Sequence, residues 1–328
     1  MIDLQTIRDA RSRIASHIIA TPTEPSSSLS KLFHVPVVLK LEHRQKTGSF
    51  KLRGATNAIL QLPDADRSRG VVAVSTGNHG RALAYAARAA GSRATICMSH
   101  LVPDNKVSEI RRLGADVRIL GRSQDEAEHE VDRLVKQDGL VVLPPFDHPA
   151  IIAGQGTLGL EIIEAVPNVE TVLVPVSGGG LAAGVAVAVK GLRPNAKIIG
   201  VSMERGAAMK ASLDAGHPVQ VEELRSFADA LGGGIGLDNK WTFNMCQQLL
   251  DDLIVLTEEE IAAGIRHAYH EEREIVEGSG AVGIAALLSS KVGHLTGPTA
   301  VILSGRNIAM ELHQQVLNGM TDPDQEAA

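Results

Sequence analysis

Short apolar runs that alternate with helical patterns are the feature that most constrains how this chain can fold. Four such runs occur in the first half of the chain, at residues 71–75, 93–98, 117–120 and 140–143. Four more follow, at residues 172–176, 197–202, 253–256 and 299–303. Buried strands that alternate with helices are typical of parallel sheets covered by helices on both faces. The pattern therefore predicts an α/β protein with two lobes, each a doubly wound parallel sheet.

Helical spacing and end signals place the intervening helices. We predict helices at residues 4–17, 52–62, 78–90, 105–113, 124–137, 156–165, 181–190, 258–274 and 279–289. Asp3 is the expected cap of the first helix, and Thr257 with Glu260 forms an expected capping box. Residues 21–30 are expected to break the first helix and to form a loop. Residues 35–41 indicate a strand at an edge or early position, because they include a proline.

Composition and charge exclude several classes of protein. The 328 residues carry a net charge of −6 and no arginine-rich stripe, which gives no basic surface for nucleic acid. The apolar runs stop well short of the ~20 residues that a membrane helix needs. Cys97 and Cys246 lie far apart beside apolar residues, so we expect buried free thiols in a reducing compartment. The start of the sequence has no basic region followed by an apolar run, which predicts a cytoplasmic protein.

Lys51 is a candidate nucleophile. A polar turn with a glycine, residues 46–49, precedes Phe50 and Lys51 at the start of the predicted helix. Apolar neighbours would desolvate the ammonium group and lower its pKa, and a neutral amine attacks an aldehyde. Most lysines at helix starts face solvent, so Lys51 alone does not decide between a Schiff-base role and a surface position.

A run of three glycines follows one predicted strand and opens a helix. Residues 177–181 read Ser-Gly-Gly-Gly-Leu, directly after the apolar run 171–176. Glycines let successive backbone N–H groups point at one anion, and a helix N-terminus adds the positive end of its dipole. The segment fits a phosphate cradle, but taken alone a tight turn between strand and helix explains it equally well.

A second polar loop also joins a strand to a helix. Residues 75–80 read Ser-Thr-Gly-Asn-His-Gly, and their N–H groups and hydroxyls suit a carboxylate. We expect His79 to cap or pack against the helix rather than to act as a general base, because nothing in the sequence pairs it with an acid.

Together these segments resemble the motif set of the fold-type-II pyridoxal-phosphate enzymes, specifically the serine/threonine dehydratase and serine racemase group. The resemblance is carried by Ser-Phe-Lys-Leu-Arg-Gly-Ala at 49–55, by residues 75–80 and 177–181, and by Ser-Gly at 304–305. The motifs occur in the family's order at family-like spacing, and the resemblance covers about residues 21–308. It implies pyridoxal 5′-phosphate (PLP) as the cofactor and a two-lobed fold like that of the tryptophan synthase β subunit.

The resemblance also implies a role for each matching residue. Lys51 would hold PLP as a Schiff base and would take the substrate Cα proton. The glycines would hold the 5′-phosphate, Asn78 would donate to the phenolate oxygen O3′, and Ser304 would hydrogen-bond the pyridine nitrogen. The expected cofactor-binding residues are Phe50, Lys51, Asn78, Gly178, Gly179, Gly180, Leu181 and Ser304. The residues expected to bind the substrate carboxylate are Ser75, Thr76, Gly77, Asn78 and His79.

The function that the resemblance implies is a PLP-dependent dehydratase or ammonia-lyase. It would remove water from a threonine- or serine-like hydroxy-amino acid and yield a 2-oxo acid and ammonia. An amino-acid racemase is the alternative, because Thr76 keeps a hydroxyl where the racemases carry a serine that protonates the opposite face. The segments at 200–206 and 232–239 are similar to those of hydroxyectoine-utilisation dehydratases, so a hydroxyectoine-derived amino acid is a further candidate substrate. A non-catalytic phosphate- or nucleotide-binding protein is the alternative from a different class.

Three segments need separate interpretation. Many members of the resembled family carry a cation-binding glutamate where this chain has Ser202, and here the nearest glutamate, Glu204, comes two places later. Asp214 remains a candidate ligand. We therefore predict no metal site but leave a divalent or alkali cation open. Residues 154–159 fit a dinucleotide fingerprint as a string, yet no buried strand precedes them, and we expect a loop and helix start near substrate or cofactor. Residues 232–236 resemble the family's glycine segment beside the cofactor ring, with a flexible loop as the alternative.

The predicted domains follow the two series of strands. Residues 1–64 and 149–328 would form a large PLP-binding domain, and residues 65–148 a small mobile domain that caps the substrate. Family members are commonly dimers, so a homodimer that binds a small amino-acid substrate is expected, without nucleic acid or membrane as partner. The sequence stops soon after Ser304, so a regulatory domain and feedback control by isoleucine are not expected.

Overall fold

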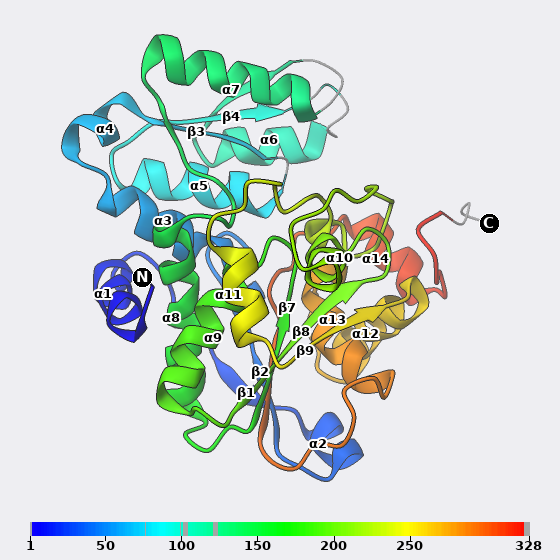
Figure 1. Cartoon of the computed structure of the whole chain (residues 1–328). Coiled ribbons are helices and arrows are strands. Elements are labelled where there is room, and N and C mark those ends of the chain that lie inside the picture. Colours follow the sequence, from blue (N-terminus) through cyan, green and yellow to red (C-terminus); the bar gives the residue numbers. More distant parts are fainter. Residues whose placement is uncertain (1, 76, 99, 101–103, 121–123, 325–328) are drawn as a thin grey trace.

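Two β-sheets form the framework of the protein. The computed structural model describes residues 2–75, 77–98, 100, 104–120 and 124–324. The larger sheet has the order β1 (Thr23–Pro25), β2 (Val37–Lys40), β10 (Thr299–Ile302), β7 (Thr171–Pro175), β8 (Lys197–Met203) and β9 (Asp252–Leu256). The smaller sheet has the order β5 (Asp116–Ile119), β4 (Ala94–Met98), β3 (Val71–Val74) and β6 (Val141–Val142). Among these strands only the β1–β2 pair is antiparallel. Figure 1 shows the two lobes, with the smaller sheet at the top.

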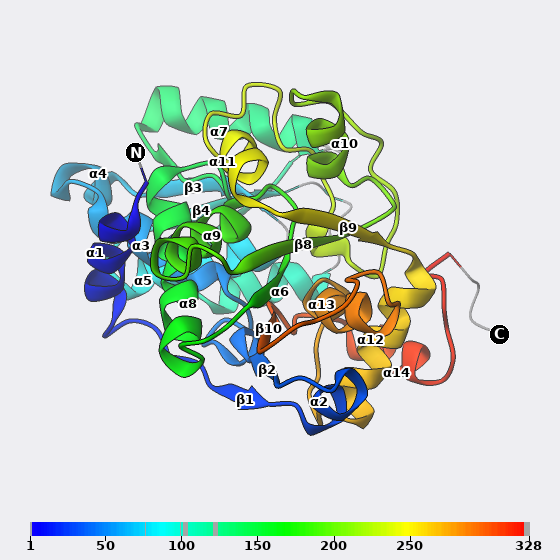
Figure 2. The ribbon, with the colours of Figure 1, turned by 60° about the horizontal axis from the view of Figure 1, so that its bottom comes forward.

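Helices cover both faces of the larger sheet, as alternating burial along its strands requires. Val172 and Val174 pack with α8 (Pro149–Ala165), α9 (Gly180–Leu192) and α11 (Thr242–Leu249). Leu173 points to the opposite face and packs with α12 (Glu258–His270) and α13 (Gly278–Leu288). In Figure 2, β8 and β9 lie between these two groups of helices. The predicted doubly wound sheet is confirmed.

The smaller sheet is covered in the same way. Val71 and Ala73 pack toward α5 (Asn78–Ala89) and α6 (Asp104–Arg112), whereas Val72 packs toward α7 (Gln124–Asp138). Helix α3 (Lys51–Gln61) joins the two lobes, because Leu52 and Ile59 belong to the core of the small lobe while another face of α3 packs on α8. The α3–α8 contact is close: a Cβ on Gly154 would stand 2.6 Å from the Cα of Gly54. The first turn of α3 is therefore fixed between the lobes.

Several predicted elements need correction. Residues 21–30 are not all loop: they form β1 and the start of α2 (Ser27–Phe33), because Ser26 Oγ accepts the N–H of Leu29 and caps that helix. Of the two alternatives for residues 35–41, the edge position is wrong, since β1 and β10 pair on the two sides of β2. The early position of the proline is confirmed, because Pro36 directly precedes β2. The chain also forms short helices that the sequence pattern does not predict, namely α4 (Asp64–Arg69), α10 (Ala208–Ala215), α11 and α14 (Met310–Leu317).

Other local expectations are confirmed. Asp3 caps α1 (Leu4–Ile14), and Thr257 and Glu260 form the reciprocal capping box of α12. Cys97 and Cys246 are buried and free. Within the described part of the chain, no helix combines the length and the apolar character that crossing a membrane requires.

Candidate active site

One cavity lies where the carboxyl ends of β3 and β7 meet, the usual place for a ligand in parallel sheets. Its volume is about 260 Å³, and both lobes contribute to its wall. The small lobe supplies the loop after β3 and the start of α5, and the large lobe supplies the turn between β7 and α9. Of the predicted residues, the wall includes Phe50, Lys51, Ser75, Gly77, Asn78, His79, Gly178, Gly179, Gly180 and Leu181. Thr76 lies outside the described residues.

Lys51 is held at the first position of α3 with its amine in this cavity. Its Nζ donates to the carbonyl oxygen of Pro145 at 2.9 Å and lies 5.3 Å from the centre of the Phe50 ring. Burial lowers the pKa of Lys51 to about 8, although the carboxyl group of Glu277 raises it in part. At pH 7 roughly a tenth of the amine is therefore unprotonated and able to attack an aldehyde, far more than for an ordinary lysine.

The triple-glycine turn lines the cavity at the start of α9. Gly179, the N-cap of α9, has a φ of +86°, which favours glycine, and no side chain caps the helix. A Cβ on Gly178 would overlap the ring of Phe146, and one on Gly180 would stand 3.0 Å from the Phe146 backbone. The first N–H groups of α9 are thus left for an anion, and the helix dipole favours negative charge there.

Ser75 and His79 each form a hydrogen bond near the start of α5. Ser75 Oγ accepts the N–H of Gly80 in the first turn of α5 at 2.9 Å. His79 is buried and hydrogen-bonds through Nε2 to the carbonyl of Leu143 at 2.8 Å. Burial, together with the charge of Lys51, lowers the pKa of His79 to about 3, so its ring is neutral. These contacts are those of a packing residue, and no acid contacts His79 in the part of the chain that the structure describes.

Glu277 and Asn307 line the cavity, and the sequence analysis identified neither of them. Glu277 precedes α13, and Asn307 follows β10. Asn78 Nδ2 donates to Glu277 Oε1 at 2.6 Å, and Asn307 Nδ2 donates to Asn78 Oδ1 at 2.5 Å. Burial, with the nearby charge of Asp229, raises the pKa of Glu277 to about 7. A glutamate in a loop before a helix of small residues was the available signal, but its partner is 199 positions away in the sequence.

Ser304 is buried, but its hydroxyl does not form part of the cavity wall. Its Oγ donates to the carbonyl of Ser279 at 3.2 Å. Ser279 itself lines the cavity, and its buried hydroxyl has no hydrogen-bond partner among the described residues. A second serine therefore stands beside Ser304, and the sequence analysis did not identify it.

The prediction that residues 154–159 form a loop and a helix start is wrong. The segment lies inside α8, which begins earlier because His148 caps it and Pro149 occupies its first position. Its glycines allow close packing, since a Cβ on Gly156 would stand 2.8 Å from the carbonyl of Gly184 in α9. None of the three glycines 154, 156 and 159 lines the cavity.

The glycine segment at 232–236 and the candidate cation ligands lie in different parts of the structure. Gly232, Gly233 and Gly234 line the cavity, as the resemblance implies for a glycine segment beside the cofactor ring. Of the candidate cation ligands, Asp214 is paired with Lys210 at 2.6 Å, and Glu204 lies 3.7 Å from Lys291 Nζ. In the described ranges the structure brings together no group of three His, Cys, Asp or Glu residues that could hold a metal ion.

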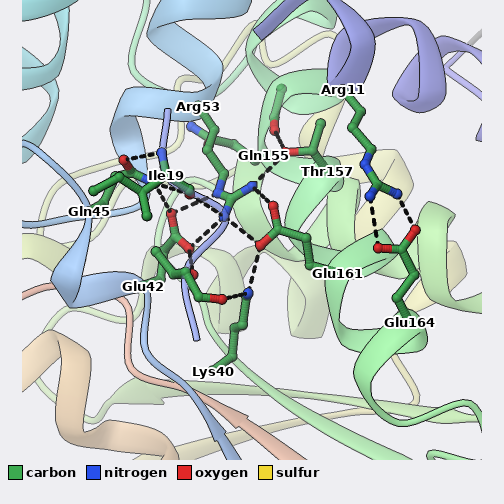
Figure 3. Close-up of polar contacts among 12 residues, drawn as sticks. Arg11, Ile19, Lys40, Glu42, Gln45, Arg53, Gln155, Thr157, Glu161 and Glu164 are labelled. Atoms are coloured by element: carbon green, nitrogen blue, oxygen red, sulfur yellow. Dashed lines mark hydrogen bonds and ion pairs between the residues drawn. The ribbon is translucent and has the colours of Figure 1, made fainter. Parts of the chain in front are cut away.

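A buried cluster of charges lies two residues beyond Lys51 on α3 (Figure 3). Arg53 donates to Glu42 and to Glu161, and Lys40 donates to Glu161 at 2.6 Å. Arg53, Glu42 and Lys40 are at most 1% exposed. Two cations face two carboxylates, so the cluster is neutral as a whole. It ties α3 to α8 and to the end of β2.

The cavity fits a phosphorylated aldehyde. It combines a desolvated amine, open N–H groups at a helix start and a buried serine hydroxyl without a partner among the described residues. The comparisons agree with this fit. A family model described as "Pyridoxal-phosphate dependent enzyme" matches residues 14–305.

Relatives and solved structures support the same family. A protein of Sinorhizobium fredii named "Putative threonine dehydratase" is 66% identical over 99% of this chain and 98% of its own length. An L-threonine ammonia-lyase of Thermotoga maritima is 40% identical over 97% of this chain and 79% of its own. Maize serine racemase superposes with a TM-score of 0.91 at 33% identity, covering 96% of this chain and 97% of that one.

The chain therefore belongs to the fold-type-II PLP-dependent enzymes, in the serine/threonine dehydratase and serine racemase group. It is an enzyme, its cofactor is PLP, and its curated relatives belong to the dehydratases and ammonia-lyases of this family. This membership contradicts the alternative of a non-catalytic phosphate-binding protein.

Proposed function

We propose that this enzyme eliminates water from a β-hydroxy-amino acid of the threonine or serine type and releases a 2-oxo acid and ammonia. The single observation that carries the proposal is the placement of the desolvated Lys51 amine in one cavity with the triple-glycine turn. The names of the relatives support the reaction type, since the 66% and 40% identical proteins are named threonine dehydratase and threonine ammonia-lyase.

Each side of the cavity has a distinct task in this proposal. The N–H groups of residues 178–180 would hold the phosphate of PLP, and Lys51 would hold its aldehyde. Asn78 would donate to the phenolate oxygen of the ring. Ser304, whose hydroxyl donates to the carbonyl of Ser279 in this structure, would turn that hydroxyl to the ring nitrogen when the cofactor is bound. When bound, PLP supplies an electron-accepting ring that makes loss of the substrate Cα proton feasible.

The protein's own residues then orient and deprotonate the substrate. The loop at 75–79 would bind the α-carboxylate through its N–H groups and hydroxyls, which sets the direction of the Cα–H bond. Lys51, once released, would take the Cα proton with its neutral amine. A neutral serine, rather than a carboxylate, near the ring nitrogen favours elimination over a long-lived carbanion.

The substrate itself is tested by a panel. Purified enzyme would be assayed for ammonia release from L-threonine, L-serine and hydroxyectoine-derived amino acids, and threonine is the expected best substrate. Lys51→Ala should abolish release, whereas Lys46→Ala, an exposed lysine five positions earlier, should not. Borohydride reduction followed by peptide mapping should place the pyridoxyl label on residue 51. Ammonia release that survives in Lys51→Ala would refute the proposal.

Racemisation is the second candidate, and the superposition with maize serine racemase favours it. Thr76 would be the acid or base on the face opposite Lys51. Chiral analysis of the products from L-serine separates the two reactions, because D-serine indicates racemisation and pyruvate alone indicates elimination.

Three further proposals concern motion, assembly and location. The small domain, residues 65–148, would close over the substrate and exclude water. A homodimer is supported by exposed apolar side chains near the contact between α12 and α14, where Tyr269 is 40% and Met310 52% exposed. A cytoplasmic location agrees with the two free buried thiols. Light scattering tests the dimer, and protease sensitivity with and without substrate tests the closure.

A further inference from the structure

Glu277 is a buried carboxyl group whose two oxygens both accept hydrogen bonds. Asn78 Nδ2 donates to Oε1 at 2.6 Å, and the backbone N–H of Asn307 donates to Oε2 at 2.8 Å. Glu277 is 4% exposed, and a Cβ on Gly305 would overlap its Oε1. So close an approach leaves the carboxyl group little freedom to rotate.

The orientation of the Asn307 side-chain amide is determined by groups that cannot change roles. Its Nδ2 donates to the carbonyl of Thr47 at 3.0 Å, and its Oδ1 accepts from Arg81 Nη1 at 3.2 Å. A carbonyl only accepts and a guanidinium only donates. The amide nitrogen of Asn307 must therefore point toward Thr47 and its oxygen toward Arg81.

The orientation of Asn78 follows from these two neighbours. Asn307 Nδ2 donates to Asn78 Oδ1 at 2.5 Å, and Asn78 Nδ2 donates to Glu277. A flipped Asn78 would set two amide nitrogens against each other. Above the pKa of Glu277, which is about 7, the flip would also set the Asn78 oxygen against an ionised carboxylate. The oxygen of Asn78 is thus engaged, and its nitrogen keeps one N–H. Because Asn78 lines the cavity, it can offer a ligand there a donor.

We propose that Glu277, together with Asn307, is a positioning residue that fixes the Asn78 amide with its free N–H toward the phenolate oxygen of PLP. Neither residue needs to touch the cofactor. The inference rests on the proposed function in one respect, namely that Asn78 faces the ring oxygen. In this role Glu277 determines whether the nitrogen or the oxygen of the Asn78 amide faces the cofactor.

The test compares two ligands that differ only at the ring oxygen. Pyridoxine 5′-phosphate has a free phenol at the ring oxygen, and in its 3-O-methyl ether that oxygen is methylated. Neither compound carries an aldehyde, so Lys51 does not react with either of them. Binding would be followed by the fluorescence of Trp241, the only tryptophan, which stands at the N-cap of α11 next to Thr242, the residue that a Cβ on Gly179 would meet. The wild-type protein should prefer the free phenol roughly tenfold, the effect of one hydrogen bond to a charged group.

Two variants should remove this preference. In Glu277→Gln the amide offers a donor where the carboxylate accepts, which allows Asn78 to flip, and the preference should fall to within about twofold. Asn307→Ala should do the same and decides the matter if Glu277→Gln does not fold. Glu274→Gln is the matched control, because it neutralises another buried carboxylate, bound to His43 and Arg44 outside the cavity, and should keep the tenfold preference.

The remaining outcomes separate this inference from the proposed function. An equal loss of affinity for both ligands in Glu277→Gln, or an unchanged preference in both variants, overturns the inference. If Asn78→Ala alone removes the preference, Asn78 faces the ring oxygen and only the role of Glu277 fails. If the wild-type protein shows no preference while borohydride labels Lys51, the placement of Asn78 fails and the inference with it.

Discussion

Arg53 forms a two-point ion pair with Glu42 in a part of the structure where both side chains are 0% exposed. Nε lies 2.7 Å from Oε1 and Nη2 lies 2.9 Å from Oε2. The same guanidinium reaches Glu161 on α8, and Gln155 on α8 accepts the N–H of Gly54 at 3.1 Å (Figure 3). Since Lys51 is two residues earlier on α3, these contacts fix the turn that carries the nucleophile.

Replacing Arg53 should therefore destabilise the protein strongly. Arg53→Met leaves two carboxylates in the interior with Lys40 as their remaining cation, and removing one partner of a buried pair costs roughly 3–5 kcal/mol. Arg11→Met breaks the half-exposed pair with Glu164 and should cost only about 0–1 kcal/mol. Urea denaturation measures both free energies of unfolding. Equal small losses in the two variants would show that the buried cluster contributes little.

The lowered pKa of Lys51 predicts how fast the apoenzyme takes up PLP at different pH values. Because only the neutral amine attacks the aldehyde, the rate constant should rise about tenfold per pH unit below the pKa. It should level off above pH 8, since the pKa of Lys51 is about 8. Stopped-flow absorbance at several pH values measures this rate. An inflection near the ordinary lysine pKa of about 10.4 would show that Lys51 is not desolvated in solution.

Gly179 and Gly216 share a left-handed backbone but differ in their surroundings, which gives a matched pair of variants. A Cβ on Gly179 would stand 2.8 Å from Cys246 Sγ, whereas one on Gly216 meets nothing within 4 Å. Both alanine variants should lose about 1 kcal/mol or more through backbone strain. Only Gly179→Ala should also weaken PLP binding, by about tenfold or more, because it distorts the turn that would hold the phosphate. Fluorescence titration with PLP distinguishes the two variants, and equal affinities would contradict the phosphate assignment.

The sequence predicts the strands and long helices of this protein well, because alternating burial and helical spacing are local properties. Val172 and Val174 face one core and Leu173 the other, as the apolar run 171–176 requires. The errors arise where a distant contact decides the structure. The glycines at 154–159 resemble a ligand-binding loop in the sequence, but in the structure they allow α3 and α9 to pack closely on α8.

The candidate site is predictable only in part for the same reason. Lys51, Asn78 and the triple glycine belong to recognisable local motifs, and the structure brings them to one cavity. Glu277, Ser279 and Asn307 belong to segments far along the chain, and they join the site only because α13 and β10 fold against the end of β2. No local sequence pattern indicates which of these side chains contact one another, so the sequence alone does not predict the hydrogen bonds that orient Asn78.

Asp147, at the end of the small lobe, contacts the start of the helix that packs behind the triple-glycine turn. Its carboxylate accepts the N–H groups of Lys240, Trp241 and Thr242, and so caps the first turn of α11. Helix α11 in turn packs behind the cradle, where a Cβ on Gly179 would meet Thr242 and Cys246. Asp147→Ala should therefore cost about 0.5–2 kcal/mol of stability and also weaken PLP binding several-fold.

Asp3→Ala provides the comparison, because Asp3 caps α1 by accepting the N–H of Thr6 and is remote from the cavity. It should lower the melting temperature without changing the affinity for PLP. Thermal melts of the apoenzymes and titrations with PLP measure the two effects separately. If both variants lose stability and neither loses affinity, the cap serves α11 alone and the cradle does not depend on it.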